Sequence, residues 1–490
     1  MNEKSSYSHI LKYTSLFGGI QAITMLANIV RNKVMAVFLG TAGVGLNTML
    51  YTAQAFASQF TNLGLSFGAV PRLSDNYEHA DEAQIHYSIQ VIRLWSLITA
   101  ALGFLFCLAI SPLLGNFTFT WGHFYHHYAV LGISVAAIAI TGGETAILKA
   151  TRRLKLLARV QGYTALASIV ISVPLYYFMS YSGILPAIIL MALFAAVATV
   201  VCSYRCYPFK MDFSRSMLRD GMAMIRLGLA FVLAAALGSG SEMLIRSYLN
   251  VEGGLSDVGL YNAAYMIVIT YGGMVFSSLE VDYFPRLSAV SKDIANTNEM
   301  VNKQIEVSLL LLAPMLVALL MLLPVLVPLL FSSQFIPMVT MAQVAVLAMY
   351  LKVLTMPVAY ITLARSRSLA FLFLETIYFL SLVISIVLGY TYWGIYGTGL
   401  AIVAAHAIEF LTTWSYAYWK FGYRCKQTIG RYASIQLLIG GVAYAVSVSC
   451  EGMAYWTAEA ALTIVSTAYS LSVLRQKTHL WQALRRKFRI

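Results

Sequence analysis

Charged residues are scarce in this sequence of 490 residues. Asp, Glu, Lys and Arg make up 11% of the chain, whereas hydrophobic residues make up 59%. A soluble domain carries about 25% charged residues. With a mean hydropathy of +0.74, this chain has too little polar surface to stay in water. Apolar runs of about 20 residues, long enough to cross the hydrocarbon core of a bilayer, recur along its length. The composition therefore excludes a soluble protein and indicates a membrane protein.

The sequence also lacks the signatures of bound metals and nucleotides. Its five cysteines include no CxxC pair, which argues against a zinc site or a disulfide framework. No segment matches the G-x-x-x-x-G-K-[ST] loop of ATP-binding proteins, and no predicted loop is long enough to hold a soluble domain. We expect no cofactor and no metal. If the protein moves a substrate uphill, the energy would then come from a gradient of H+ or Na+, or from the gradient of the substrate itself.

Lys and Arg are absent from every second loop of the predicted topology. The loops 111–121, 180–183, 249–257, 331–337, 391–394 and 451–454 contain neither residue, whereas 149–159, 205–226 and 475–489 are basic. By the positive-inside rule, the basic loops and both termini face the cytoplasm. This distribution accounts for the net charge of +13 without a nucleic-acid partner.

The apolar runs predict an all-α polytopic membrane protein with fourteen transmembrane helices. We place them near residues 14–36, 44–69, 85–110, 122–148, 157–179, 184–204, 222–248, 258–281, 305–330, 338–362, 370–390, 395–418, 431–450 and 455–474.

Two stretches of the chain resemble each other. Residues 44–75 and 258–289 align without a gap at an offset of 214 and share nine identities, including Val-Gly-Leu near the start and Pro-Arg-Leu-Ser near the end. Each copy predicts a membrane helix that ends at its Pro-Arg pair and exits into a polar loop. Arg153 and Arg367 keep the offset, whereas the sequence around Tyr181 resembles that around Tyr392 with three residues of drift.

Six helices separate equivalent positions, so the repeat is parallel, as in several transporter folds. It predicts two pseudo-symmetric six-helix lobes, at residues 1–213 and 214–424. Two additional helices and a basic cytoplasmic tail would follow at 425–490.

Polar stripes on two predicted helices suggest a substrate site. Asn28 and Arg31 lie on one face of the first helix, and Glu242 and Arg246 lie on one face of the seventh. If the stripes face each other across a pseudo-two-fold axis, they form a cationic cavity, to which Lys352 in the tenth helix would contribute. Guanidinium groups suit phosphate oxygens. The alternative is that Arg246 only pairs with Glu242 and that Arg31 extends to the outer surface.

A second group of ionisable residues lies within predicted spans near the C-terminal end of the repeat. Glu375, Glu409 and His406 are candidates for an ion-coupling site, because a buried carboxylate can take up and release a cation. Glu375 and Lys352 would equally suit a structural ion pair. Arg93 and Lys149 lie nearer to helix ends, where we expect them to reach water.

The Val-Gly-Leu entry, the Pro-Arg exit and the plan of six, six and two helices resemble the polysaccharide transporters of the multidrug/oligosaccharidyl-lipid/polysaccharide exporter superfamily. The O-antigen flippases resemble the chain from end to end. The resemblance implies a V-shaped bundle in the bacterial inner membrane. It would carry an undecaprenyl-pyrophosphate-linked oligosaccharide to the periplasmic leaflet by alternating access, among membrane lipids and beside a polysaccharide polymerase and a chain-length regulator. No catalytic residues are implied.

Three alternatives follow from the same sequence. A multidrug antiporter of this superfamily would be expected to have a carboxylate-lined cavity, whereas the stripes here carry more cations than acids. The lipid II flippase has a similar helix plan, and sequence separates it poorly. A polymerase or ligase would need a large periplasmic loop for catalytic residues, which is absent from the predicted topology, so an enzyme is the least favoured class.

Overall fold

The computed structural model describes residues 3–78, 82–118, 125–208 and 214–477. All regular elements in these ranges are helices, which confirms the all-α prediction. The chain divides into two compact units. The N-terminal unit comprises Met1–Gly259 with Leu330–Ser332, and the C-terminal unit comprises Leu260–Leu329 with Ser333–Ile490. These units are defined by contacts and not by the sequence repeat, so the predicted repeat boundaries at 1–213, 214–424 and 425–490 stay a prediction.

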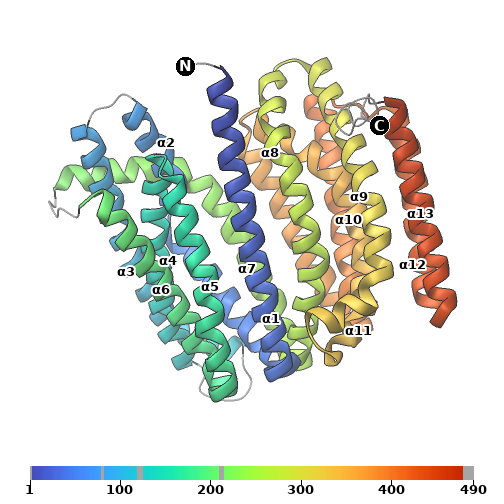
Figure 1. Cartoon of the computed structure of the whole chain (residues 1–490), viewed down its shortest axis with the longest axis horizontal. Coiled ribbons are helices and arrows are strands. Elements are labelled where there is room, and N and C mark those ends of the chain that lie inside the picture. The colour runs from blue at the N-terminus through green and yellow to red at the C-terminus, as the bar shows by residue number, and fades with distance from the viewer. Residues whose placement is uncertain (1–2, 79–81, 119–124, 209–213, 478–490) are drawn as a thin grey trace. The chain divides into compact units, whose positions relative to one another are not determined.

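The N-terminal unit contains the first seven long helices (Figure 1). They are α1 (Glu3–Thr61), α2 (Leu65–Glu78), α3 (Glu82–Thr118), α4 (Tyr125–Ala150), α5 (Leu154–Met179), α6 (Ile184–Cys206) and α7 (Arg215–Tyr265), with a short 3-10 turn at Ser180–Gly183. The last residues of α7 belong to the C-terminal unit.

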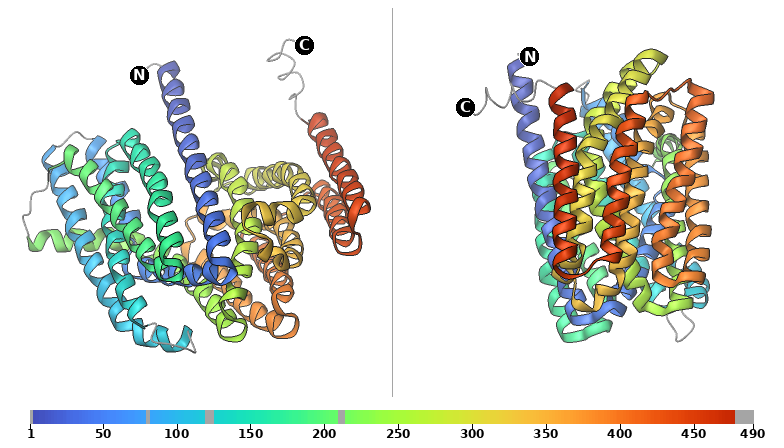
Figure 2. Two further views of the ribbon diagram at one scale, coloured as in Figure 1. Left: turned by 60° about the horizontal axis from the view of Figure 1, so that its bottom comes forward. Right: turned by 90° about the vertical axis from the view of Figure 1, so that its right-hand side faces the viewer.

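The C-terminal unit contains a π-helical turn at Met266–Tyr271 and the remaining helices. They are α8 (Gly272–Val290), α9 (Ile294–Leu330), α10 (Val339–Ala364), α11 (Ser368–Phe421), α12 (Gln427–Ser449) and α13 (Gly452–Lys477), with a 3-10 turn at Ser333–Met338. Helices α12 and α13 run side by side and are joined by a tight turn (Figure 2).

Three of the longest helices each contain one glycine with non-helical backbone angles. These are Gly40 in α1, Gly254 in α7 and Gly394 in α11, with φ of 63°, 82° and 58°. Each lies in a predicted loop, so each of these helices comprises two predicted spans. Nine helical segments of the described chain are long and apolar enough to cross a membrane. The chain is therefore a multi-pass membrane protein, while the count of fourteen spans stays a prediction.

The backbone repeats at the same offset as the sequence. Three pairs of residues with positive φ lie 214 apart: Gly40 with Gly254, Arg152 with Ser366, and Ser180 with Gly394. The repeat therefore extends well beyond residues 44–75. The predicted drift of three residues between Tyr181 and Tyr392 is wrong, because the turn that begins at Ser180 matches the one at Gly394 without drift.

The Pro-Arg pairs do not end their helices, which corrects the prediction of an exit loop at that point. Pro71 lies inside α2, which continues to Glu78, and Pro285 lies inside α8, which continues to Val290. The arginines take part in contacts that hold these extensions. Arg72 donates to the backbone oxygen of Asp220 at 2.9 Å, and Arg286 pairs with Asp282 one turn earlier at 2.9 Å.

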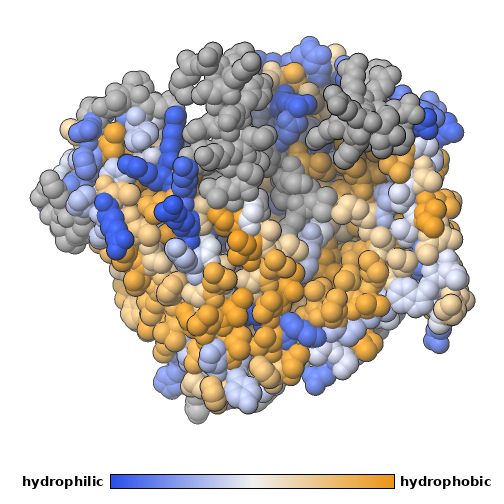
Figure 3. Space-filling view, in the orientation of Figure 1, coloured by the Kyte–Doolittle hydropathy of each residue, from blue (hydrophilic) through white to orange (hydrophobic). Residues whose placement is uncertain are grey.

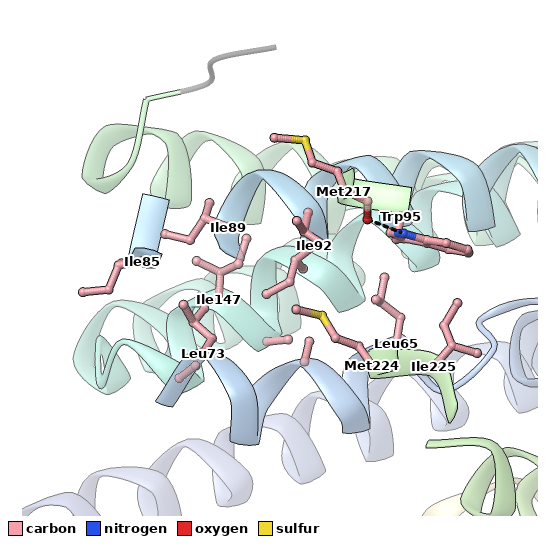
Figure 4. Close-up of a cluster of buried hydrophobic side chains, with 14 residues drawn as sticks. Leu65, Leu73, Ile85, Ile89, Ile92, Trp95, Ile147, Met217, Met224 and Ile225 are labelled. Carbon is pink, nitrogen blue, oxygen red and sulfur yellow. Dashed lines mark hydrogen bonds between the residues drawn. The ribbon is translucent and has the colours of Figure 1, made fainter. Parts of the chain in front are cut away.

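A buried cluster joins α2, α3 and α4 to the start of α7 within the N-terminal unit (Figure 4). Ile85, Ile89 and Ile92 of α3 recur at helical spacing and face this core. The Trp95 indole donates to the backbone oxygen of Met217 at 3.3 Å. These contacts fix the first turns of α7 against α2 and α3.

Large apolar side chains are exposed along the outside of several helices, as a membrane protein requires. On α5, Val170 and Phe178 are 72% and 80% exposed. In the part of the surface that contains α4 and α5, Figure 3 shows hydrophilic residues near the upper end and a broad hydrophobic band along the middle. An apolar surface of this extent is not stable in water.

Candidate functional site

Arg31 on α1 is directed into the N-terminal unit and contacts neighbouring helices. Its Nη1 donates to the Tyr51 hydroxyl at 3.5 Å and lies 3.7 Å from the Met191 sulfur on α6. The guanidinium carbon is 5.7 Å from the centre of the Tyr51 ring. Its Nε atom is buried and has no hydrogen-bond partner among the described residues. Arg31 is therefore a half-buried cation whose described contacts include no carboxylate.

Arg246 on α7 is buried and paired. Its Nη1 lies 3.1 Å from the Glu242 carboxylate and donates to the Glu242 backbone oxygen at 3.2 Å. The side chain of Arg246 is 6% exposed, whereas that of Glu242 is 41% exposed. Glu242 thus offsets part of the charge of Arg246, as the alternative interpretation of this stripe anticipated. Asn28 is half-buried, and no described contact joins it or Arg246 to Arg31.

Arg93 does not reach water, which corrects the sequence prediction. Its Nε donates to Glu144 on α4 at 2.8 Å, and the two side chains are 4% and 3% exposed. The guanidinium also lies over the Tyr204 ring of α6, 4.1 Å from its centre. Arg93 is therefore neutralised by a buried ion pair. Lys149, by contrast, is exposed as predicted.

A cavity of about 320 Å³ lies between α4 and α6 in the N-terminal unit. It runs along one face of α4 from Ile138 to Lys149 and is closed on the other side by Ala192 and Ala195 of α6. Its volume is at the lower end of the range for ligand pockets, about 300–1,000 Å³. The small residues on both helices create the space, and Lys149 places a cation at its end.

The C-terminal unit brings together all four ionisable residues that the sequence singled out there. His406 Nδ1 lies 2.7 Å from the Glu409 carboxylate one turn later on α11. Glu375, also on α11, interacts electrostatically with Glu409 and with Lys352 of α10. Lys352 and Glu375 do not form a direct ion pair in the described structure, so the expected structural pair is only a long-range attraction.

Tyr378 completes this cluster and was missed from the sequence. Its hydroxyl lies 3.5 Å from His406 Nε2, and the two rings are 5.1 Å apart. Tyr378 also interacts electrostatically with Tyr265, which is the repeat equivalent of Tyr51 beside Arg31. The same repeated tyrosine thus borders a cation in one unit and an acidic cluster in the other. Its position one turn after Glu375 was the available signal.

Metal-binding clusters are absent from the described ranges: no group of three His, Cys, Asp or Glu side chains is arranged to hold an ion. All five cysteines are free, as predicted. Burial raises the pKa of the Cys425 thiol, which lies between α11 and α12. A thiol with a raised pKa reacts more slowly at neutral pH, so Cys425 lacks the activation of a catalytic cysteine.

Comparisons with known proteins agree with the fold. A sequence model described as polysaccharide biosynthesis protein matches residues 34–340, more than half of the chain. The inward closed conformation of the lipid II flippase MurJ is similar, with a TM-score of 0.74 at 14% identity, covering 94% of this chain and 99% of that chain. No curated protein sequence matches this chain.

Two further solved structures show the same architecture. An inward-facing multidrug resistance MATE family transporter of the MOP superfamily has a TM-score of 0.69 at 15% identity, covering 81% of this chain and 94% of that chain. A MOP superfamily transporter from Pyrococcus furiosus Vc1, described as having a binding pocket of reverse polarity, has a TM-score of 0.58 at 14% identity, covering 90% and 97%. At these identities the similarity shows the fold alone.

Proposed function

Because the chain belongs to the polysaccharide biosynthesis protein family, we propose that it is a flippase for undecaprenyl-pyrophosphate-linked oligosaccharide. The cargo would be an O-antigen or exopolysaccharide repeat unit. It would pass from the cytoplasmic to the periplasmic leaflet of the bacterial inner membrane by alternating access. Its partners would be this lipid-linked oligosaccharide and membrane lipids, with a polysaccharide polymerase and a chain-length regulator nearby. Both termini would face the cytoplasm.

The observation that carries the proposal is the environment of Arg31. A buried charge without a counter-ion is costly, and in membrane proteins such residues mark the path of a substrate or an ion. Arg31 has aromatic and sulfur neighbours but no described carboxylate. A pyrophosphate would supply the missing negative charge and accept from the guanidinium in a bidentate manner. The other substrate-binding candidates that the sequence predicts are Arg246, Lys352, Asn28 and Glu242.

Ion coupling is assigned to the acidic cluster of the C-terminal unit. Glu409 and His406 are in direct contact, and Glu375 interacts with both Glu409 and Lys352. Two carboxylates that interact repel each other when both are ionised, and binding of a cation relieves this repulsion. We propose that H+ or Na+ binds here, with no other cofactor, and that the protein is a transporter and not an enzyme.

A cation-coupled multidrug antiporter and a lipid II flippase are the competing functions, since proteins of both kinds share the fold. The unpaired Arg31 opposes a cavity for cationic drugs, because like charges repel. The fold neighbour with a pocket of reverse polarity shows that this architecture also accommodates a pocket of different charge. Lipid II carries a pyrophosphate too, so only its sugar and peptide would distinguish it.

The test compares lipid-linked oligosaccharides and drug sensitivity in cells that lack the protein. We expect undecaprenyl-linked repeat units to accumulate on the cytoplasmic side and surface polysaccharide to be lost. Arg31→Ala should fail to restore the surface polysaccharide, whereas Arg205→Ala, which removes an exposed arginine of the same unit, should restore it. A normal lipid pool with raised drug sensitivity would instead establish the antiporter, and accumulation of lipid II would establish its flippase.

A further inference from the structure

Glu459 is a carboxylate buried inside the C-terminal unit, on the last described helix, α13. Its side chain is 0% exposed. Both carboxyl oxygens are buried and have no hydrogen-bond partner among the described residues. It lies outside both copies of the repeat and outside the acidic cluster of Glu375 and Glu409. The proposed function does not use it.

The groups around Glu459 leave it no counter-ion. The titratable residues that interact with it are Tyr350 on α10 and Tyr455 one turn earlier on α13. Both hydroxyls donate their hydrogen bonds to α9 and not to Glu459. Tyr350 donates to the Ala313 backbone oxygen at 3.3 Å, and Tyr455 donates to the Leu320 backbone oxygen at 2.9 Å. No Lys, Arg or His of the described chain forms an ion pair with Glu459.

Helix α12 does not supply a partner either. Its Gln436 side chain donates to the Ser470 hydroxyl at 2.9 Å and accepts from the Ser466 hydroxyl at 2.8 Å. These bonds hold α12 against α13 but do not reach Glu459. Helix α12 also contributes Gly440, where a side chain would clash with the Tyr350 ring at 2.7 Å. Tyr350 therefore packs closely beside α12.

An ionised carboxylate is not stable in such surroundings, because burial removes its hydration and nothing replaces it. A protonated carboxyl is neutral and tolerates burial far better. We propose that Glu459 is a proton-binding site: it holds a proton while α13 packs against α9 and α10, and it releases the proton when these helices separate and water enters. Protonation and close packing of α13 are then linked, so each favours the other.

A sodium ion is a poorer occupant of this site. Sodium binding requires several oxygen ligands around the ion, and Glu459 belongs to no group of three His, Cys, Asp or Glu side chains in the described structure. The nearest tyrosine oxygens donate to α9 and are held there. A proton needs only the carboxyl group itself.

The direct test is infrared spectroscopy of the full-length protein in lipid nanodiscs at neutral pH. A protonated carboxylic acid has a carbonyl stretch that is separate from the amide bands and shifts in heavy water. We expect such a band in the native protein and its loss in Glu459→Gln, with no loss in Glu451→Gln, which alters an exposed carboxylate just before α13. An unchanged band in a folded Glu459→Gln protein would overturn the proposal. So would a carboxylate band that is lost in this variant and responds to sodium.

If Glu459→Gln does not fold, Glu459→Asp keeps the acid and should shift the band, and an unshifted band would again overturn the proposal. This measurement needs no substrate, so it is independent of the proposed flippase activity. The expected effect of Glu459 on transport, by contrast, rests on the proposed flippase function. Glu459→Gln imitates the protonated state permanently and should lower repeat-unit transport by about 5–150-fold, the usual range of a coupling between sites. A fall in transport without loss of the infrared band would assign Glu459 a packing role only.

Discussion

Two arginines of the N-terminal unit, the buried Arg93 and the half-buried Arg31, lie in different environments. Arg93 has a carboxylate partner at 2.8 Å, a second bond from Nη2 to the other Glu144 oxygen at 3.3 Å, and an aromatic ring over its face. Arg31 contacts only a tyrosine hydroxyl and a thioether among the described side-chain hydrogen bonds. The first environment satisfies a charge within the protein, whereas the second leaves it available to a ligand. We therefore expect loss of Arg93 to lower the stability of the protein and loss of Arg31 to lower transport.

Arg93→Met should destabilise the N-terminal unit by about 3–5 kcal/mol, because it leaves the Glu144 carboxylate buried without its partner. The double variant Arg93→Met with Glu144→Leu removes both charges and should regain most of that loss. Thermal unfolding of the purified protein in detergent measures both. If the double variant were as unstable as the single one, packing and not charge would explain the effect.

The sequence identified several charged residues within helices but not their partners. The repeat and the low charge content indicated where Arg31, Glu375 and Glu409 are. Whether Arg93 meets Glu144 or water depends on how α3 and α4 are rotated, which no local pattern determines. Glu459 was missed although it lies within the predicted span 455–474, since a single acid in an apolar helix has no sequence neighbour that marks it.

At the scale of elements, the two copies of Val-Gly-Leu contact each other. A side chain at Gly45 would lie 1.9 Å from the Leu255 backbone oxygen, and one at Gly259 would lie 2.0 Å from that of Thr41. Leu255 and Thr41 are themselves separated by the repeat offset, so the contact is reciprocal. Nearby, the hydroxyls of Thr41 and Ser256 are 2.7 Å apart. The conserved spacing of the repeat thus has a structural reason, which is the close approach of α1 and α7.

Gly45→Ala should therefore lower stability by at least about 1–3 kcal/mol, the usual cost of overpacking. Gly162→Ala is the control, because a side chain there meets nothing within 4 Å. It should raise stability by about 0.5–1 kcal/mol, since alanine is the better helix former. Melting temperatures of the two variants should shift in opposite directions. Equal shifts would show that helix propensity and not close packing governs both sites.

A tyrosine from α13 bonds to a backbone oxygen of α9 that a proline leaves without its helical donor. Pro324 cannot donate to the backbone oxygen of Leu320, four residues earlier. The Tyr455 hydroxyl donates to that oxygen instead, at 2.9 Å. Tyr455→Phe should cost about 1 kcal/mol, the worth of one hydrogen bond. In a Pro324→Ala background the helix supplies its own donor, so the same change should cost little. Unfolding measured for all four proteins gives the coupling, and additive effects would contradict it.

The kinks also show how far the sequence predicts the elements. The breaks at Gly40, Gly254 and Gly394 coincide with predicted loops, because glycine tolerates positive φ where two spans meet. The sequence places the ends of α2 and α8 several residues too early, because a Pro-Arg pair suggests the end of a helix. Prolines inside membrane helices are tolerated when neighbouring groups satisfy the freed backbone, and such neighbours are not visible in a local sequence pattern.

For the whole molecule, the distribution of Lys and Arg predicts an even number of spans and a fixed orientation. Cys425, between α11 and α12, should face the cytoplasm, and Gln334, between α9 and α10, should face the periplasm. In a protein whose other cysteines are changed to serine, a membrane-impermeant maleimide added outside intact spheroplasts should leave Cys425 unlabelled. With Cys425 also replaced, Gln334→Cys should be labelled.

Permeabilised membranes are the control, and there Cys425, which is exposed, should react. Labelling of Cys425 from outside would reverse the predicted orientation. Labelling of both positions from the same side would instead contradict the number of crossings between them. A reversed orientation would also place Arg31 and Lys149 at the opposite membrane faces from those that the sequence predicts. The direction of pyrophosphate transport depends on this topology, so it is the measurement that the flippase proposal needs at the largest scale.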